Sequence, residues 1–223
     1  MSVPTADPAA GVDSASAEPT LAVEHLTVTY GSYTALDDFS CRAHAGRILG
    51  LIGPNGAGKS STFAGITASI KRASGTIRLE GEDVTHWSNQ RLARAGVRRT
   101  FQQNSFFGEL NVLENAMATL TETGGVPVGL SLVAPWVQWR SQRRLRTQAE
   151  ELLHRFGVAS KYFGSPPDRL PYGLQRVLSI ALAYGPGVDA LLLDEPAAGI
   201  GGADMERLSE VLYSLRDERS SGD

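Results

Sequence analysis

The segment Ile48-Leu49-Gly50-Leu51-Ile52-Gly53-Pro54-Asn55-Gly56-Ala57-Gly58-Lys59-Ser60-Ser61 carries the strongest structural signal in the chain. Its first five residues form a continuous apolar run, which is typical of a strand buried on both faces. A glycine-rich turn follows, and the residues after it predict a helix that continues to about Ser69. A buried strand that leads through glycines into a helix indicates an α/β core.

The glycine-rich turn matches the P-loop pattern, two glycines five residues apart followed by Lys and Ser. Glycines let the backbone N–H groups point inward at phosphate oxygens, and the positive end of the helix adds to the attraction. We expect Lys59 to reach the β- and γ-phosphates, Ser60 to ligate Mg²⁺ and Ser61 to contact the α-phosphate. The alternative, a turn that binds nothing, fits the strand-helix context less well. The predicted nucleotide-binding residues are Gly53, Pro54, Asn55, Gly56, Ala57, Gly58, Lys59, Ser60 and Ser61.

A second apolar run, Ala190–Leu193, ends in two carboxylates, Asp194 and Glu195. Asp194 is placed to hold magnesium, and Glu195 to polarise a water molecule that attacks phosphorus. An acidic pair that ends a strand is weak evidence alone, because such residues often lie at a surface. Together with the P-loop it indicates a nucleotide-hydrolysing site.

The rest of the chain divides into a strand-helix core and a helical insertion. Residues 1–20 are rich in Ala, Ser, Pro and acidic residues, which predicts a disordered tail. No strand pattern is present from 103 to 169, so a helical lobe of about 103–184 is expected. The predicted strands are 21–30, 33–43, 48–52, 75–79, 97–102 and 190–193, and the predicted helices after the first are 112–120, 140–156, 172–184 and 204–218.

Composition limits the class of protein. The chain has 223 residues, 42% of them hydrophobic, and a net charge of −3, which argues weakly against nucleic acid as a partner. Its single cysteine, Cys41, cannot form an intramolecular disulfide and is expected to be a buried or half-buried residue on a strand. No apolar run reaches the ~18 residues that a transmembrane helix needs.

The arginines between 140 and 146 favour a solvated helix face over a lipid or permease contact.

Further segments resemble the ATP-binding cassette (ABC) family in order and spacing. Tyr30 looks like the family's adenine-stacking aromatic residue, and Thr100-Phe101-Gln102 like its glutamine loop, which touches magnesium and the attacking water. Residues 170–176 resemble its signature motif, a helix N-terminus offered to ATP on the other subunit. The resemblance implies Glu195 and Gln102 as catalytic residues and Ser60, Gln102 and Asp194 as magnesium ligands. The implied signature residues are Leu170, Pro171, Tyr172, Gly173, Leu174 and Gln175.

The family resemblance also implies a fold, an activity and partners. The fold is a P-loop NTPase core over 21–223, RecA-like with a mostly parallel sheet, an antiparallel β portion and the inserted helical lobe. The activity is ATP hydrolysis with Mg²⁺ that powers an ABC membrane transporter, from the cytoplasmic face of the cell membrane. The partners are a second ATP-binding subunit, transmembrane permeases and, indirectly, a solute-binding protein, with no nucleic acid. Details such as Arg98–Gln102 and 194–199 look like subunits of branched-chain amino acid importers, with urea and short amide importers similar.

Several positions depart from the family pattern. Pro171 stands where Ser is usual, Leu174 where a polar residue is common, and Gly201 where an Asp or Asn bridges the subunits. The chain also ends at Asp223, before the family's next strand and its γ-phosphate histidine. The sequence therefore predicts a truncated cassette with little ATPase activity. Two alternatives stay open: a non-hydrolysing cassette that binds only nucleotide or a partner, and a soluble ABC protein without a transport role.

Overall fold

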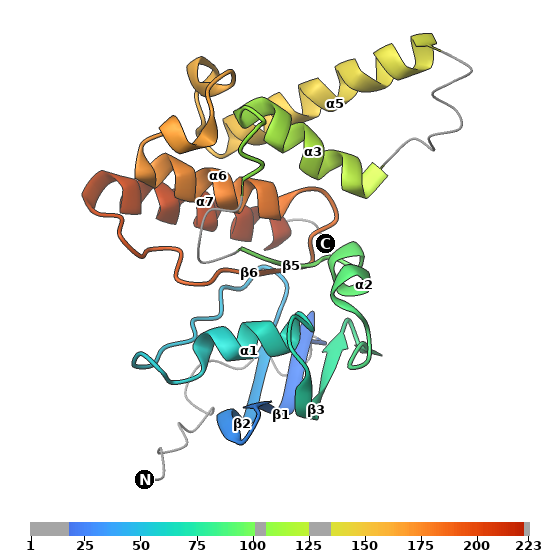
Figure 1. The fold of residues 1–223 in the computed structure, drawn as a ribbon, viewed down its shortest axis with the longest axis vertical. Coiled ribbons are helices and arrows are strands. Elements are labelled where there is room, and N and C mark those ends of the chain that lie inside the picture. The colour runs from blue at the N-terminus through green and yellow to red at the C-terminus, as the bar shows by residue number, and fades with distance from the viewer. Residues whose placement is uncertain (1–17, 101–105, 125–134, 221–223) are drawn as a thin grey trace.

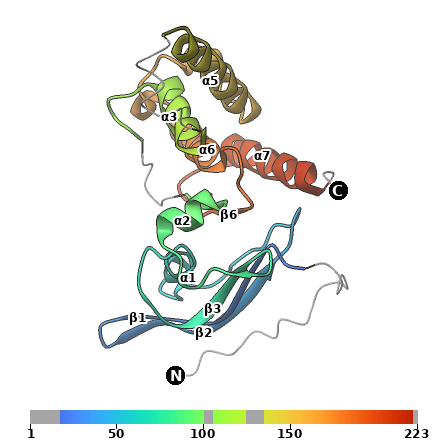
Figure 2. The ribbon, with the colours of Figure 1, turned by 90° about the vertical axis from the view of Figure 1, so that its right-hand side faces the viewer.

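The computed structural model describes residues 18–100, 106–124 and 135–220. These residues form two lobes, with a β-sheet and one crossing helix below and a group of helices above in Figure 1. A short pair of strands lies between the two lobes (Figures 1 and 2). Most of the predicted tail, residues 1–17, lies outside the described residues. Gln102 also lies outside them.

The lower sheet is antiparallel and has the order β2-β1-β3-β4. Strand β1 (Leu21–Tyr30) pairs with β2 (Tyr33–Ala43) on one side and with β3 (Arg72–Leu79) on the other, and β4 (Glu82–Asp83) follows β3. The turn between β1 and β2 places Gly31 at φ 60°, a conformation that glycine adopts without strain. The predictions of paired strands at 21–30 and 33–43 and of a strand at 75–79 are confirmed.

Helix α1 (Lys59–Ile66) lies across this sheet (Figures 1 and 2). A Cβ atom at Gly65 would come within 3.0 Å of the Val28 side chain, so glycine lets the helix approach β1 closely. Val23, Leu26 and Val28 are fully buried beneath it. Helix α2 (Asn89–Arg94), which the apolar pattern did not reveal, packs beside β5 and is capped by the Ser88 hydroxyl.

The short parallel pair consists of β5 (Val97–Arg99) and β6 (Ala190–Leu192). Side chains alternate along β6: Leu192 joins the core of the sheet lobe, whereas Leu191 and Leu193 pack against the core of the helical lobe. Strand β6 is therefore held from both sides by apolar contacts, and the residue that follows it is fixed in position.

The helical lobe contains α3 (Val112–Gly124), α5 (Pro135–Arg155), α6 (Tyr172–Tyr184) and α7 (Gly202–Ser220), with short 3-10 turns at Ser160–Tyr162 and Pro167–Arg169. Its centre is fully buried and includes Leu153, Phe156 and Leu178. All four helices were predicted, and the α6 prediction matches in both bounds. None of the helices in the described part of the chain is long and apolar enough to span a bilayer.

Two predictions about the sheet are wrong for the described residues. Residues 48–52 form no strand, and Ile48 and Ile52 are 57% and 95% exposed. The sheet is not mostly parallel either, because only β5 and β6 pair in that sense. An apolar run supplies strand propensity, but a strand also needs a neighbour whose N–H and C=O groups complete its ladder. Within the described ranges, neither the sheet β2-β1-β3-β4 nor the pair β5-β6 includes residues 48–52, so this run has no strand partner.

The thiol of Cys41 provides a test of the sheet packing. It lies on β2 opposite Val23, and burial raises its pKa from an ordinary 9.0 to about 11. Only the thiolate reacts with iodoacetamide, so native protein at pH 8 should be alkylated about 100-fold more slowly than urea-unfolded protein. The thiol of the unfolded protein ionises at a lower pH than the buried thiol. The free energy of unfolding should therefore fall as pH rises from about 9 to 11. Equal labelling rates by mass spectrometry would contradict the burial.

Candidate nucleotide-binding site

The P-loop takes a tightly curled form between β2 and α1. Gly56 and Gly58 both have φ 84°, and the Ala57 N–H donates to the Pro54 carbonyl at 3.2 Å. A Cβ atom at Gly58 would lie 2.5 Å from the carbonyl oxygen of Ala35, which is too close for any side chain. Left-handed glycines of this kind turn successive N–H groups toward one side, where an anion can bind.

Lys59 is the first residue of α1, and its ammonium group folds back over the loop. Its Nζ donates to the carbonyl oxygens of Gly53 at 2.7 Å and Pro54 at 2.9 Å. Among the described residues no carboxylate pairs with this ammonium group. The charge is therefore held by neutral acceptors only, and phosphate oxygens would be stronger acceptors for it.

Ser60 and Asp194 come together across 134 residues of sequence. The Ser60 hydroxyl donates to Asp194 Oδ1 at 3.2 Å, and Asp194 is 2% exposed at the end of β6. A hydroxyl and a carboxylate are both oxygen ligands of the kind that Mg²⁺ prefers. The donor set therefore fits the magnesium site predicted from the sequence.

Arg99 is a member of this site that sequence reasoning missed. Its Nη2 donates to Asp194 Oδ2 at 2.6 Å, and its side chain is only 15% exposed. The next residue, Thr100, accepts a hydrogen bond from the Asp194 N–H at 3.3 Å. In the sequence, Arg99 stands out only as part of the segment Arg98–Gln102, which resembles importer subunits. The available signal was a basic residue in the predicted strand 97–102, and the tertiary structure alone pairs that strand with the one before Asp194.

The remaining predicted residues near the P-loop vary in their surroundings. Glu195 is exposed and adopts φ 46°, a conformation that costs a residue other than glycine ~1–3 kcal/mol and is found most often at functional sites. Tyr30 is 49% exposed beside Tyr33 in the β1–β2 hairpin, so its ring has a free surface on which a base could stack. Gln102 lies outside the described residues, and its predicted role stays a prediction.

The predicted signature residues form the start of α6 in the helical lobe. Pro171 is the N-cap and offers no side-chain bond, whereas the Gln175 amide donates to the Leu170 carbonyl at 2.8 Å. A Cβ atom at Gly173 would lie 2.3 Å from the carboxylate of Asp204 on α7, so a larger residue here would have to displace Asp204. Leu174 is 6% exposed and packs in the lobe core, which accounts for an apolar residue at a commonly polar position.

The sequence profile of the ABC transporter family matches residues 36–198. The chain belongs to the ABC transporter family. It is similar to the high-affinity branched-chain amino acid transport ATP-binding proteins LivG of Salmonella typhimurium and BraF of Pseudomonas aeruginosa. The identities are 32% over 204 residues, covering 92% of this chain and 80% of LivG, and 30% over 202 residues, covering 91% and 79%.

Solved structures of ABC cassettes have the same fold. A nucleotide-free ATP-binding cassette from an ABC transporter aligns with TM-score 0.76 and 24% identity, over 91% of this chain and 79% of the other. A dimeric cassette bound to ADP and Pi in a post-hydrolysis state aligns with TM-score 0.72 and 21% identity, over 89% and 83%. The P-loop NTPase class predicted from the sequence is confirmed, and this member of the ABC family is an ATPase.

Gly58→Ala should damage both the fold and nucleotide binding of this ABC protein. The substitution combines left-handed strain of ~1–3 kcal/mol with the contact to the Ala35 carbonyl. Gly187→Ala is the matched control, because Gly187 has φ 72° but no atom near the added Cβ. We expect Gly58→Ala to lose more thermal stability than Gly187→Ala. It should also bind fluorescent ATP at least ~10-fold more weakly, because a free-energy cost of ~1.4 kcal/mol corresponds to a tenfold change in affinity. Equal losses in the two variants would show that the close contact is unimportant.

Proposed function

We propose that this ABC ATPase powers a membrane importer of branched-chain amino acids. The observation that carries the ATPase part is the convergence of Lys59, Ser60 and Asp194 at one end of α1. The solute is inferred from LivG and BraF, whose names describe branched-chain amino acid transport and which match over nine-tenths of the chain. No relative described above supports the alternative of an ABC protein without a transport role.

Nucleotide binding would begin at the P-loop. Lys59 would exchange the Gly53 and Pro54 carbonyls for β- and γ-phosphate oxygens, and the N–H groups around Gly58 would bind the phosphates. Ser60 and Asp194 would hold Mg²⁺. When bound, the ion would neutralise charge on the phosphates.

Hydrolysis would depend on Glu195 and the predicted Gln102. Glu195 would accept a proton from water as the water oxygen bonds to the γ-phosphorus and the bond to the bridging oxygen of ADP breaks. Its exposed side chain, one residue beyond buried Asp194, would reach a phosphate that is bound to Lys59. Gln102 would orient the same water.

A second ATP-binding subunit would complete each site. Helix α6 belongs to the helical lobe while α1 crosses the sheet of the other lobe (Figure 1), so the signature residues would serve ATP bound to a second copy or a homologous subunit. The Gly173 N–H remains available as a donor there, although Pro171 has none. The dimeric cassette with ADP and Pi is a precedent for such an assembly in the same fold.

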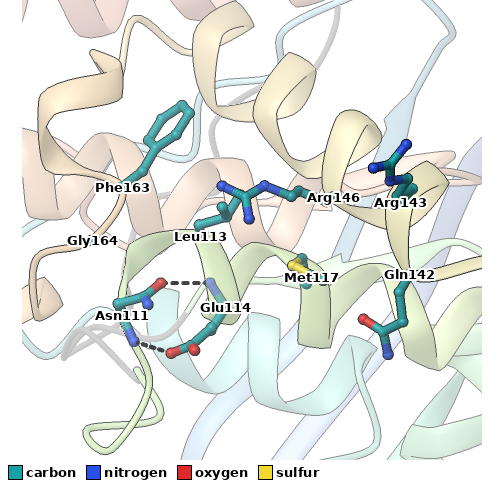
Figure 3. Close-up of a pocket in the computed structure, with 9 residues that line it drawn as sticks. All are labelled: Asn111, Leu113, Glu114, Met117, Gln142, Arg143, Arg146, Phe163 and Gly164. Carbon is teal, nitrogen blue, oxygen red and sulfur yellow. Dashed lines mark hydrogen bonds between the residues drawn. The ribbon is translucent and has the colours of Figure 1, made fainter. Parts of the chain in front are cut away.

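A hollow of about 780 Å³ between α3 and α5 is the surface that we assign to a permease (Figure 3). Leu113, Met117 and Phe163 provide apolar surface within it. Arg143 and Arg146, the latter paired with Glu150, line it from α5, so our assignment replaces the solvated face expected there from the sequence. One edge of the hollow is the start of α3, where Asn111 and Glu114 exchange two hydrogen bonds of 2.9 Å that hold the backbone in place. The remaining lining residues are Gln142 and Gly164.

The ATPase proposal is tested by two substitutions in the purified protein. Glu195→Gln should keep ATP binding but lower turnover by ~100-fold or more, because a general base contributes about that factor. Lys59→Ala should lose both, because it removes the cation expected to reach the β- and γ-phosphates. Phosphate release and fluorescent-nucleotide titration measure the two properties. A Glu195→Gln protein that hydrolyses ATP at the parent rate would exclude Glu195 as the base.

The same variants test the transport role when the protein is reconstituted with its permease in vesicles. Labelled leucine should be taken up with the parent protein and ATP, and Glu195→Gln should abolish the uptake. Urea and acetamide should not compete with leucine. Uptake that is blocked by these amides but not by isoleucine or valine would reassign the solute and leave the ATPase proposal intact.

The docking surface is tested by crosslinking. Phe107 is 59% exposed just before α3, so a photoreactive residue at this position should crosslink to the permease. Tyr213 on α7 is similarly exposed at 53% but belongs to another helix, and is the matched control. Permease adducts from position 213 but none from 107 would place the permease on a different face.

A further inference from the structure

Both oxygens of the Asp194 carboxylate are bound, and by different parts of the fold. The Ser60 hydroxyl from α1 donates to Oδ1 at 3.2 Å, and Arg99 Nη2 from β5 donates to Oδ2 at 2.6 Å. Thr100, next to Arg99, also accepts the backbone N–H of Asp194. Strand β5 therefore holds Asp194 at its main chain and at one carboxylate oxygen.

The Arg99–Asp194 pair has the features of a functional contact. Removing two charges from water offsets much of their attraction, so a buried ion pair is a weak source of stability. Arg99 Nε is also buried and has no hydrogen-bond partner within the described residues, which adds a cost. Its guanidinium lies 5.9 Å from the ring of Phe63 on α1, so it contacts both elements that border the site. An arrangement that costs stability is expected where activity requires it.

Arg98, the neighbouring arginine, carries the same charge but points away from Asp194. Successive residues of a strand point to opposite faces, and a Cβ atom built at Gly185 would lie 3.1 Å from Arg98 Nη1. Arg98 thus points toward the end of α6, whereas Arg99 points toward Asp194. The chain offers two adjacent arginines of which one reaches the carboxylate.

We propose that Arg99 is a positioning residue for the metal-binding carboxylate. By holding Oδ2, it fixes the Asp194 plane so that Oδ1, the oxygen beside Ser60, faces the cation that accompanies the nucleotide. Partners of this kind set the orientation of a metal ligand, and their loss typically costs 10–100-fold in metal affinity or activity. The inference rests on the proposed nucleotide site, because Arg99 itself touches neither nucleotide nor water in it.

Arg99 could also have the opposite effect on cation affinity. A guanidinium close to a divalent cation repels it, so an arginine that merely neutralised Asp194 would weaken cation binding, and its removal would strengthen it. The direction of the change in cation affinity therefore separates positioning from competition.

The experiment measures Mn²⁺ binding by electron paramagnetic resonance in the presence of ADP, without turnover. Mn²⁺ takes the same oxygen ligands as Mg²⁺. Arg99→Met should weaken Mn²⁺ binding by about 10-fold or more, and Arg99→Lys, which restores a charge but not the planar fork, by about 3–10-fold. Arg98→Met, the matched control, should stay within about twofold of the parent, since it leaves the Asp194 contact intact.

Two further measurements make the outcome decisive. Fluorescent ADP binding in EDTA should be equal in all four proteins, and thermal unfolding should confirm that each is folded. If Arg99→Met fails to fold, Arg99→Lys decides. Mn²⁺ affinity that is unchanged or increased in the folded Arg99 variant overturns the positioning role. A parent protein that binds neither ADP nor Mn²⁺ would instead contradict the proposed nucleotide site.

Discussion

The buried carboxylate of Asp194 is the point on which the arrangement of the molecule depends. It receives Ser60 from α1 and Arg99 from β5, and it lies two residues beyond the end of β6. An unpaired charge at 2% exposure would be strongly unfavourable, so these contacts are required wherever the chain brings Asp194 inside. The P-loop helix and the strand pair are thereby held together by one side chain.

Apolar packing brings Asp194 to this place. Leu192 enters the core of the sheet lobe, while Leu191 and Leu193 contact the core of the helical lobe. Because neighbouring side chains of a strand point in opposite directions, a strand of three residues can bind two cores at once. Displacement of either lobe relative to β6 would move Asp194, and with it the geometry at Ser60. The candidate site is therefore mechanically linked to both lobes.

The helical lobe carries the two surfaces that we propose for a second ATP-binding subunit and for a permease. The N-terminus of α6 packs against α7 through Gly173 and Asp204, and the hollow between α3 and α5 lies in the same lobe. Leu191 and Leu193 contact the core of this lobe, and Asp194 follows Leu193 in the chain.

The sequence by itself determined the local chemistry: the P-loop, the β1–β2 hairpin, helix α6 and the acidic pair after β6 all follow from spacing and periodicity, which depend on neighbouring residues alone. It did not determine the state of 48–52, because a strand needs a partner and an apolar pattern does not supply one. Only the tertiary structure showed the Arg99–Asp194 pair, which joins positions 95 residues apart. It also revealed that Gly173 faces Asp204 so closely that a larger residue would have to displace that side chain. Such contacts are set by how lobes pack, and packing distances are not encoded in the period of any single segment.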